Sequence, residues 1–316
     1  MKIAFYEPHL CLRGTTIAMF DYAFYNQTLL NNESIIIYDK NHPATDLAVV
    51  EKFKKEFKCI EINSILDLDN ILNQENSDFI YILKGGFKDS RVSKNTKMLI
   101  HATSMAKPED VHGHKFAYVS EWMSKICSGG TLPYIPHMIN LPDTEESLRK
   151  ELNIPEEAIV FGRTGGIDTW NISFVNNVIF DVLQKRKDIF FIFQNTNLPF
   201  SHSNIIHIPT SADPLYKVKF INSCDAFLHA RQEGESFGIA CGEFSSKNKP
   251  IITWYNSIER NHIEILSNKG IYYKKYEELF SILLNFCKNN NKDWNCYKEY
   301  TPEIVIKKFN DVFLRE

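Results

Sequence analysis

Short, continuously apolar runs alternate with longer amphipathic stretches along nearly the whole chain, and this alternation constrains the fold more than any other feature. Strands that are apolar on both faces are typical of parallel sheets covered by helices on either side. We therefore predict an α/β fold built from doubly wound, Rossmann-like parallel sheets. The predicted strands are KIAFY (2–6), SIIIYD (34–39), FIYIL (79–83), KMLIHA (97–102) and KFAYVS (115–120), followed by AIVFGR (158–163), IFFIFQ (189–194), NIIHIP (204–209), AFLHA (226–230) and PIITWY (250–255).

The pattern runs through two successive halves of the chain, which predicts two domains. A length of 316 residues also favours two domains of ordinary size over one. The segment 132–146, LPYIPHMINLPDTEE, marks the boundary because its three prolines interrupt any helix. We expect one domain over residues 1–140 and a second over residues 141–300, with a hinge near 137–141. Two such domains would face each other across a cleft at the carboxyl ends of their strands.

Composition narrows the range of partners. A formal net charge of −3 argues against a protein that binds duplex nucleic acid, which would usually be basic. No apolar run approaches the length of a membrane span, and the N-terminus lacks the long apolar stretch of a signal peptide. The seven cysteines are scattered without a C-x-x-C pair, as expected for reduced residues. We therefore expect a cytoplasmic protein with no nucleic-acid partner and no evident membrane association.

Candidate ligand-binding positions in the first half follow strands. The sequence LRGTT (12–16) places Gly14 and Thr15 where a strand gives way to a helix, a position that suits an anionic group. An ordinary capped turn is the equal alternative, and the absence of G-x-G-x-x-G gives a nicotinamide dinucleotide little support. Gly85 and Gly86 end another strand. His101, at the end of KMLIHA, is a candidate cleft residue, with a structural histidine as the alternative.

The second half carries the stronger signals. In VFGRTGG (160–166), Arg163 ends a strand, where a guanidinium can hold phosphate oxygens with two hydrogen bonds. Farther on, RQEGESFGIACGEFSSKNKPIIT (231–253) sets Glu235 and Glu243 among glycines. Glycine inside a helix costs about 1 kcal/mol relative to alanine, so the glycines require an explanation. We expect the amides of Phe237, Gly238 and Ile239 to lie at the start of a helix.

The arrangement of Glu235 and Glu243 resembles the E-x7-E signature of glycosyltransferase family 4, whose members have the GT-B fold. Other segments also resemble parts of that family. They are FINSCDAFLHAR (220–231), similar to the strand before the signature, FGRTGG (161–166), similar to the first strand and loop of the donor domain, AYVSEWMSK (117–125), similar to a segment of the acceptor domain, and YIPHMINLP (134–142), similar to the hinge. The resemblance thus extends over most of the chain.

The resemblance implies roles for the candidate residues. Glu243 would bind the ribose hydroxyls of a nucleotide-sugar donor, and Glu235 would bind hydroxyls of the donor sugar. The diphosphate would lie against Arg163 and the amides of a helix start. The resemblance also implies catalytic parts for Glu235, His101 and Arg163, and donor contacts for Gly14, Thr15, Phe237, Gly238 and Ile239. Residues 301–316 would form a helix that packs back on the first domain.

The chain departs from the family at one position. Members commonly have a lysine shortly after the arginine of the GR loop, but GRTGGIDTWNI (162–172) contains Thr169 and Asn171 and no lysine. Arg13, Lys249 or Arg231 could supply the second cation, and the sequence does not decide among them.

The sequence therefore predicts a retaining glycosyltransferase that moves a sugar from a nucleotide-sugar donor to a glycan or another hydroxyl acceptor. We expect no metal and no cofactor, because arginine and helix amides can stabilise the departing diphosphate. A front-face route is favoured over a Glu235 nucleophile, since the resemblance assigns that carboxylate to the sugar hydroxyls. The alternatives are an epimerase or hydrolase of nucleotide sugars with the same fold, and a non-catalytic protein that binds nucleotide sugars.

Overall fold

The computed structural model describes residues 1–289 and 291–315. The chain divides into two compact units. The first comprises Met1–Asn140 together with Glu299–Glu316, and the second comprises Leu141–Lys298. Each unit contains a six-stranded, entirely parallel sheet with helices between most of its successive strands, which confirms the predicted α/β class.

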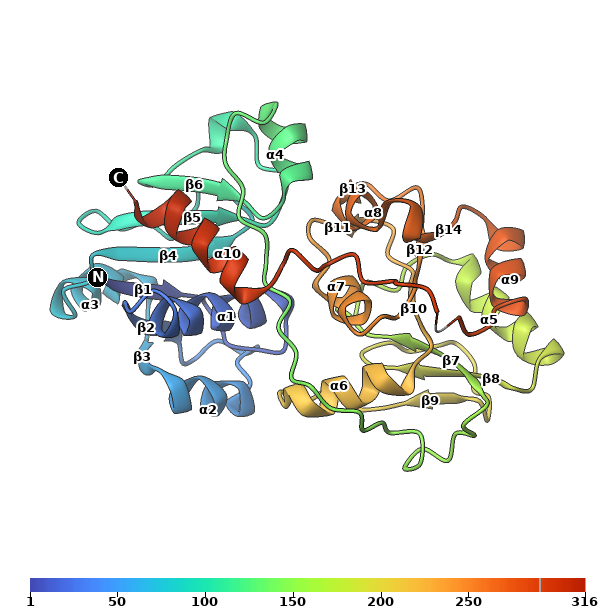
Figure 1. Cartoon of the computed structure of the whole chain (residues 1–316). Helices are drawn as coiled ribbons and strands as arrows, with labels where there is room; N and C mark the ends of the chain where they lie inside the picture. Colours follow the sequence, from blue (N-terminus) through green and yellow to red (C-terminus); the bar gives the residue numbers. More distant parts are fainter. Residues whose placement is uncertain (290, 316) are drawn as a thin grey trace. The chain divides into compact units, whose positions relative to one another are not determined.

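The first unit contains a sheet of strand order β3-β2-β1-β4-β5-β6 (Figure 1). Its central strands are almost wholly buried, and every residue of β4 is buried. The strands are β1 (Lys2–Tyr6), β2 (Glu33–Asp39), β3 (Lys58–Ile62), β4 (Phe79–Lys84), β5 (Lys97–Ala102) and β6 (Lys115–Tyr118), and the helices are α1 (Gly14–Thr28), α2 (Leu47–Glu56), α3 (Leu68–Gln74), α4 (Glu121–Ser128) and α10 (Pro302–Phe309), the last followed by a π-helical turn (Asn310–Leu314).

Helix α10 is part of the first unit although it lies at the far end of the sequence (Figure 1). Its N-terminus has the sequence signature of a helix start, with Thr301 as the N-cap residue and Pro302 in the first turn. Phe309 is fully buried, and its ring stacks on Tyr22 of α1 at a centroid distance of 5.3 Å. The same ring contacts Tyr81 of β4, so α10 completes the core beside α1.

The second unit contains a sheet of strand order β14-β12-β10-β7-β8-β9 and a two-stranded ribbon formed by β11 and β13. The strands are β7 (Ile159–Arg163), β8 (Ile189–Phe193), β9 (Ile205–His207), β10 (Ala226–His229), β11 (Gly234–Glu235), β12 (Ile251–Trp254), β13 (Glu259–Arg260) and β14 (Ile271–Tyr273), and the helices are α5 (Phe174–Lys185), α6 (Pro214–Ser223), α7 (Ile239–Ser246), α8 (Asn261–Leu266) and α9 (Tyr276–Leu284).

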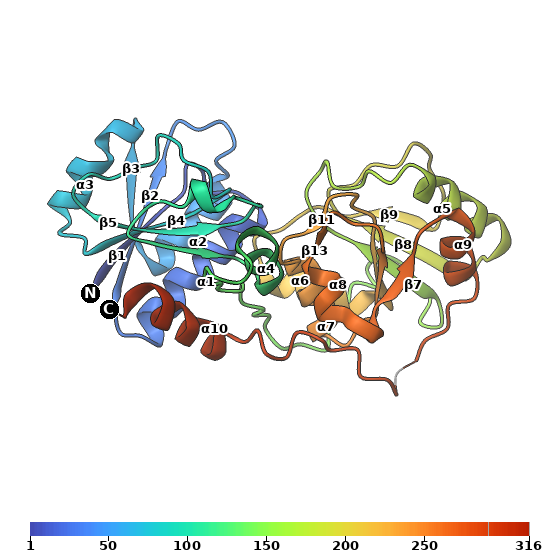
Figure 2. The same cartoon turned by 90° about the horizontal axis from the view of Figure 1, so that it is seen from above.

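The topology places a switch point in each sheet. In the second unit the chain runs from β7 outward to β8 and β9 (Figure 2), and then returns to β10 on the other side of β7 (Figure 1). The connections that leave the carboxyl ends of β7 and β10 therefore diverge, and ligands of doubly wound sheets bind at such a point. The corresponding point in the first unit lies between β1 and β4.

All the strands predicted from apolar runs are present, although some are one to three residues shorter than predicted. Four strands were not predicted. Two of them, β11 and β13, are only two residues long, and the other two, β3 and β14, lie at a sheet edge and are only partly buried. Across residues 1–289 and 291–315, no helix has the length and apolar content needed to cross a membrane.

Candidate functional site

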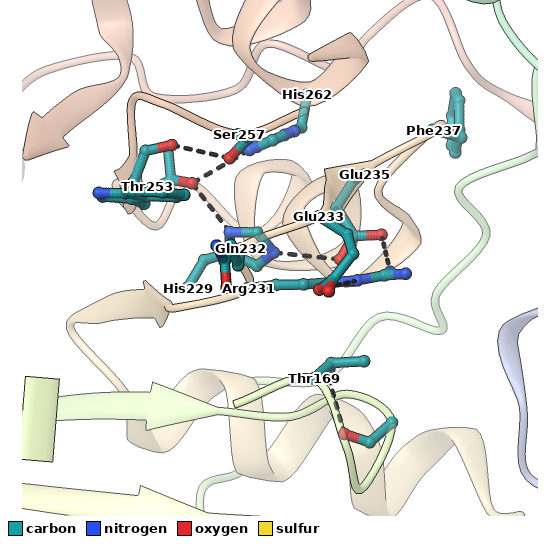
Figure 3. A network of polar contacts seen from close by, with 12 residues as sticks. Thr169, His229, Arg231, Gln232, Glu233, Glu235, Phe237, Thr253, Ser257 and His262 are labelled. Atoms are coloured by element: carbon teal, nitrogen blue, oxygen red, sulfur yellow. Dashed lines mark hydrogen bonds and ion pairs between the residues drawn. The ribbon is translucent and has the colours of Figure 1, made fainter. Parts of the chain in front are cut away.

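Glu235 is held at both of its carboxylate oxygens. Its Oε1 lies 3.0 Å from Nε2 of His229, the last residue of β10, and its Oε2 accepts a hydrogen bond of 3.2 Å from Nη1 of Arg231 (Figure 3). Burial alone would raise the pKa of Glu235, but the hydrogen bond from His229 and the positive charge of Arg231 oppose it, and the pKa is lowered to about 2. Glu235 is therefore an ionised, positioned carboxylate.

Glycine is required on both sides of Glu235. Gly234 has a φ of +76°, and a Cβ there would lie 2.0 Å from the backbone oxygen of Glu259. Gly238 has a φ of +91° and forms the N-cap of α7, where a Cβ would approach the Cβ atoms of His262 and Glu235 at 3.2 and 3.3 Å. These backbone conformations are ones that only glycine adopts readily. The glycines thus allow the chain to turn from β11 into α7 beside the carboxylate.

Helix α7 presents unpaired amides at its start. The amides of Gly238, Ile239 and Ala240 donate to no acceptor in the described part of the chain, as is usual for a first helical turn. Glu243 follows on the same helix, and only 7% of its side chain is exposed. Its Oε1 accepts a hydrogen bond of 2.7 Å from Nζ of Lys217 on α6. No described residue hydrogen-bonds to its Oε2, which leaves that oxygen available to a ligand.

Arg163, the last residue of β7, is a buried cation without an acid partner. Its residue is 2% exposed, and no carboxylate in residues 1–289 or 291–315 forms an ion pair with it. Its Nη2 donates to Thr169 Oγ1 at 2.6 Å, whereas its Nε has no hydrogen-bond partner among those residues. Burial lowers the pKa of Arg163 to about 10, so the guanidinium stays charged at neutral pH. A Cβ on Gly165 would lie 2.2 Å from its Nη1, which explains a glycine there.

The arginine, the carboxylate and the start of α7 lie close together. Burial is the main reason that the pKa of the Cys241 thiol, in the first turn of α7, is raised well above its ordinary value. Glu235 raises that pKa further, while Arg163 and Arg231 lower it. All three charged groups therefore lie within electrostatic reach of the first turn of α7.

The structure separates the three candidates for the second cation. Arg231 lies beside Glu235 and within electrostatic reach of Arg163. Lys249 precedes β12 and thus lies at the amino ends of the parallel strands, whereas Arg163 lies at a carboxyl end. It borders a cavity of about 710 Å³ that Arg149, Asp225 and Lys288 also line. Arg13 belongs to the first unit. Within the second unit, Arg231 is therefore the candidate that shares the site of Arg163.

The neighbouring polar residues have structural partners. Thr169 supports Arg163, whereas Asn171 accepts a hydrogen bond from the amide of Gln232 and donates one to Glu233. The Phe237 ring is buried against Tyr297 at a centroid distance of 5.8 Å. The side chain of Phe237 therefore belongs to the core of the second unit.

Gly14 and Thr15 belong to a second group of residues, on the first unit. Gly14 begins α1, and the Thr15 hydroxyl donates to Oε1 of Glu7 at 3.0 Å. Glu7 directly follows β1 and is 5% exposed, and its Oε2 has no partner in the described chain. Burial raises the pKa of Glu7 to about 7, although hydrogen bonds from Thr15 and Thr16 oppose the shift. Glu7 was not predicted as a site residue. The one sign of it in the sequence is an acid directly after a buried strand.

His101 lies in the core of the first unit, so the prediction of an open cleft position for it is wrong. It occupies the predicted end of β5 but is fully buried. Its Nε2 donates to the Ile135 carbonyl at 2.8 Å, and its Nδ1 accepts from the Tyr81 hydroxyl at 2.7 Å. The rings of Tyr22, His137 and Phe313 surround it, and burial lowers its pKa to about 4. His101 is a neutral core residue, because the sheet is covered at the point where the sequence suggested an open end.

Sequence analysis also missed His229, Thr253 and His262, which form a chain of contacts behind Glu235 (Figure 3). Their only sequence signals were polar side chains inside apolar segments. The described residues contain no cluster of three or more His, Cys, Asp or Glu side chains arranged to hold a metal ion.

Comparisons with known proteins support the fold. No protein-family model matches the sequence, and no curated protein matches it significantly. Among solved structures, a glycosyltransferase from Rickettsia africae ESF-5 is 15% identical, with a TM-score of 0.70 over 100% of this chain and 99% of its own. HepE of Anabaena in complex with UDP-glucose is 12% identical, with a TM-score of 0.74 over 98% of both chains.

A third similar structure comes from a different enzyme class. A Listeria monocytogenes protein assigned as a UDP-N-acetylglucosamine 2-epimerase is 10% identical, with a TM-score of 0.62 over 97% of this chain and 93% of its own. Together these likenesses show that both sheets and their connections follow the GT-B fold of glycosyltransferases.

We predict that His101→Ala destabilises the first unit by about 2–5 kcal/mol, because it leaves the buried Tyr81 hydroxyl and Ile135 carbonyl without partners and opens a cavity. Urea unfolding would measure the loss. His114→Ala is the matched control, since His114 is an exposed residue of the same unit. An unfolding midpoint of His101→Ala equal to that of the control would contradict the structural role.

Proposed function

We propose that the protein is a glycosyltransferase that transfers a sugar from a nucleotide-sugar donor to a hydroxyl acceptor, with retention of anomeric configuration and without a metal. The second unit would bind the donor. In this proposal Glu243 binds the ribose, Glu235 binds hydroxyls of the sugar, and Arg163 with the start of α7 binds the diphosphate. HepE, which shares the fold, binds UDP-glucose, so UDP-sugars are the first donors to test.

The observation that carries the proposal is the uncompensated charge of Arg163. A guanidinium that is buried without an acid is costly, and an anionic ligand would compensate it. The unpaired amides of Gly238, Ile239 and Ala240 add donors with the positive end of a helix dipole. A diphosphate matches both features. Arg231 would be the second cation in place of the lysine that the GR loop lacks.

Glu235 fits a binding role better than a nucleophilic one. Both of its oxygens already accept hydrogen bonds, and its pKa of about 2 makes it a weak nucleophile. A front-face reaction needs no protein nucleophile. The bond between the anomeric carbon and the phosphate oxygen breaks while the acceptor oxygen bonds to the same face of that carbon. The acceptor proton passes to the leaving phosphate oxygen, whose charge Arg163 and the helix amides stabilise.

The alternative is an epimerase of nucleotide sugars, which the likeness to the Listeria monocytogenes protein supports. An epimerase changes the donor without an acceptor, whereas a transferase requires one. A thermal-shift screen of sugar nucleotides identifies the donor first, because the stabilisation grows with ligand concentration relative to Kd. Incubation of that donor with and without hydroxyl acceptors then separates the two activities.

We expect a product that forms only when acceptor is present and that keeps the anomeric configuration of the donor, as read from the anomeric coupling in its NMR spectrum. An epimerised donor without acceptor would establish the alternative. An inverted product would overturn the retaining mechanism.

We predict that Glu243→Ala weakens binding of the free nucleotide by about 1.5–3 kcal/mol, the range for hydrogen bonds to a charged group. Calorimetry with UDP would measure it. Glu264→Ala, which removes an exposed acid from α8, serves as the control. If the folded Glu243→Ala variant binds nucleotide as tightly as that control, Glu243 does not hold the ribose.

We predict that Arg163→Ala lowers kcat by about 10²–10³, more than it raises the donor KM, because the guanidinium acts on charge that grows in the transition state. Arg231→Ala should give a smaller loss, since Arg231 is already paired with Glu235. Lys185→Ala, at an exposed position on α5, is the control. Full activity in excess chelator is also expected, and a strict requirement for added Mg²⁺ or Mn²⁺ would refute the metal-free mechanism.

A further inference from the structure

Three side chains form a continuous hydrogen-bonded line that ends on Glu235. The line runs from His262 at the start of α8, through Thr253 in β12, to His229 at the end of β10 (Figure 3). Thr253 Oγ1 lies 3.1 Å from His262 Nε2 and 2.8 Å from His229 Nδ1, and His229 Nε2 lies 3.0 Å from Glu235 Oε1. Thr253 and His262 are fully buried and His229 is 2% exposed, so water does not compete for these contacts.

Counting protons fixes the direction of every bond in the line. An ionised carboxylate only accepts, so His229 Nε2 must carry a proton and donate it to Glu235. The other nitrogen of a neutral His229 is then a lone pair, which accepts the single Thr253 hydroxyl proton. With that proton used, Thr253 Oγ1 can only accept from His262, whose Nε2 must therefore be the protonated nitrogen.

The reverse direction is physically worse. It would require a doubly protonated His229, and Thr253 would then donate to His262 and force the His262 proton onto Nδ1. That nitrogen is buried without a partner among residues 1–289 and 291–315, so a costly unsatisfied donor would result. Burial is also the main cause of the lowered pKa of both rings, and it brings the pKa of His262 to about 3. Both histidines are therefore neutral in a folded protein near pH 7.

We propose that Thr253 and His262 act as a relay that locks His229 into its Nε2–H tautomer, which makes His229 the positioning residue for the Glu235 carboxylate. Arg231 fixes the second oxygen, so the remaining lone pairs of Glu235 have one defined orientation. The hydrogen bonds of the relay exist without any ligand, whereas their effect on ligand binding rests on the proposed function. Loss of the relay would weaken recognition of the transferred sugar. It would not change binding of the nucleotide, which Glu243 would hold.

The relay can be tested without any ligand. In full-length protein labelled with ¹⁵N-histidine, ring nitrogen shifts and their couplings to ring protons identify the tautomer of each histidine. We expect His229 and His262 both to be neutral, with the proton on Nε2, between about pH 7 and pH 8. His229→Gln and His262→Gln serve to assign the signals. A His229 ring that is doubly protonated, or protonated on Nδ1, in the wild-type protein would overturn the inference. If the variants do not fold, sequential assignment from the backbone to the ring identifies His229 in the wild-type protein.

Variants of Thr253 test whether its hydroxyl holds His229 in a single tautomer. Thr253→Val keeps the shape but removes the hydroxyl, so His229 should show a mixture of tautomers. Thr253→Ser restores the hydroxyl and should restore the single tautomer. With a donor in hand, Thr253→Val should lower kcat/KM by about tenfold or more, as for other residues that orient a ligand-binding group, while UDP affinity stays within about twofold. Thr253→Ser should recover most of the loss.

The outcomes separate the two proposals. If the expected tautomers are found and no sugar nucleotide binds to any variant, the relay stands and the proposed function fails. If donor binds and Thr253→Val equals wild type in both tautomer and kcat/KM, the relay is wrong while the function stands. An equal loss of UDP and UDP-sugar affinity in Thr253→Val would also overturn the inference, because it indicates general damage to the second unit.

Discussion

The candidate site of the second unit depends on a positive charge that the fold removes from water and does not neutralise. Arg163 ends a central strand, and its guanidinium is buried beside the loop that contains Gly165, within electrostatic reach of the first turn of α7. The cost of such a charge is several kcal/mol unless a partner compensates it. Thr169 satisfies one nitrogen with a neutral oxygen, which adds a hydrogen bond but no negative charge.

The charged residues around Arg163 do not neutralise its positive charge. Arg231 and Glu235 form an ion pair with each other. Glu235 raises the pKa of Arg163 and Arg231 lowers it, so the three groups together keep one net positive charge. Glu243, farther along α7, is likewise paired with Lys217. The net result is a locally positive site in a protein whose formal net charge is −3. An anion would therefore be attracted by this particular position and not by the protein as a whole.

The sequence predicted the central strands of both sheets but only one of the two edge strands in each. A strand buried on both faces, such as β4, must be apolar throughout, and that run is visible in the sequence. The edge strand β3 is partly exposed and mixes polar with apolar residues, and the edge strand β14 is only three residues long, so neither shows a long apolar run. The prediction for His101 was wrong for a related reason. Its position at a strand end was correct, but packing by aromatic rings from distant segments, including Phe313, decides its burial.

The residues that a local motif could reveal were Glu235, Glu243 and Arg163, because short spacings and neighbouring glycines mark them. The relay behind Glu235 was not predictable in this way. Its members come from β10, β12 and α8, and a histidine or threonine inside an apolar strand carries no sign of its partner. His229 and Thr253 are in contact only because the parallel register of β10 and β12 places them opposite each other. Glu7 was missed for the same reason, since its partner Thr15 belongs to the following helix.

The register of β10 and β12 also links the core to the site. Thr253 is fully buried in β12, and a shift of one residue along the sheet would turn its side chain to the other face. The contact on Oε1 of Glu235 is therefore set by strand pairing deep in the second unit, whereas Arg231, from the segment before β11, holds Oε2. A carboxylate held in this way, with both oxygens already accepting hydrogen bonds, has little freedom to move toward an anomeric carbon. Such rigidity suits a group that recognises hydroxyls in a fixed geometry, and it is a poor property for a nucleophile that must close on carbon and then release it.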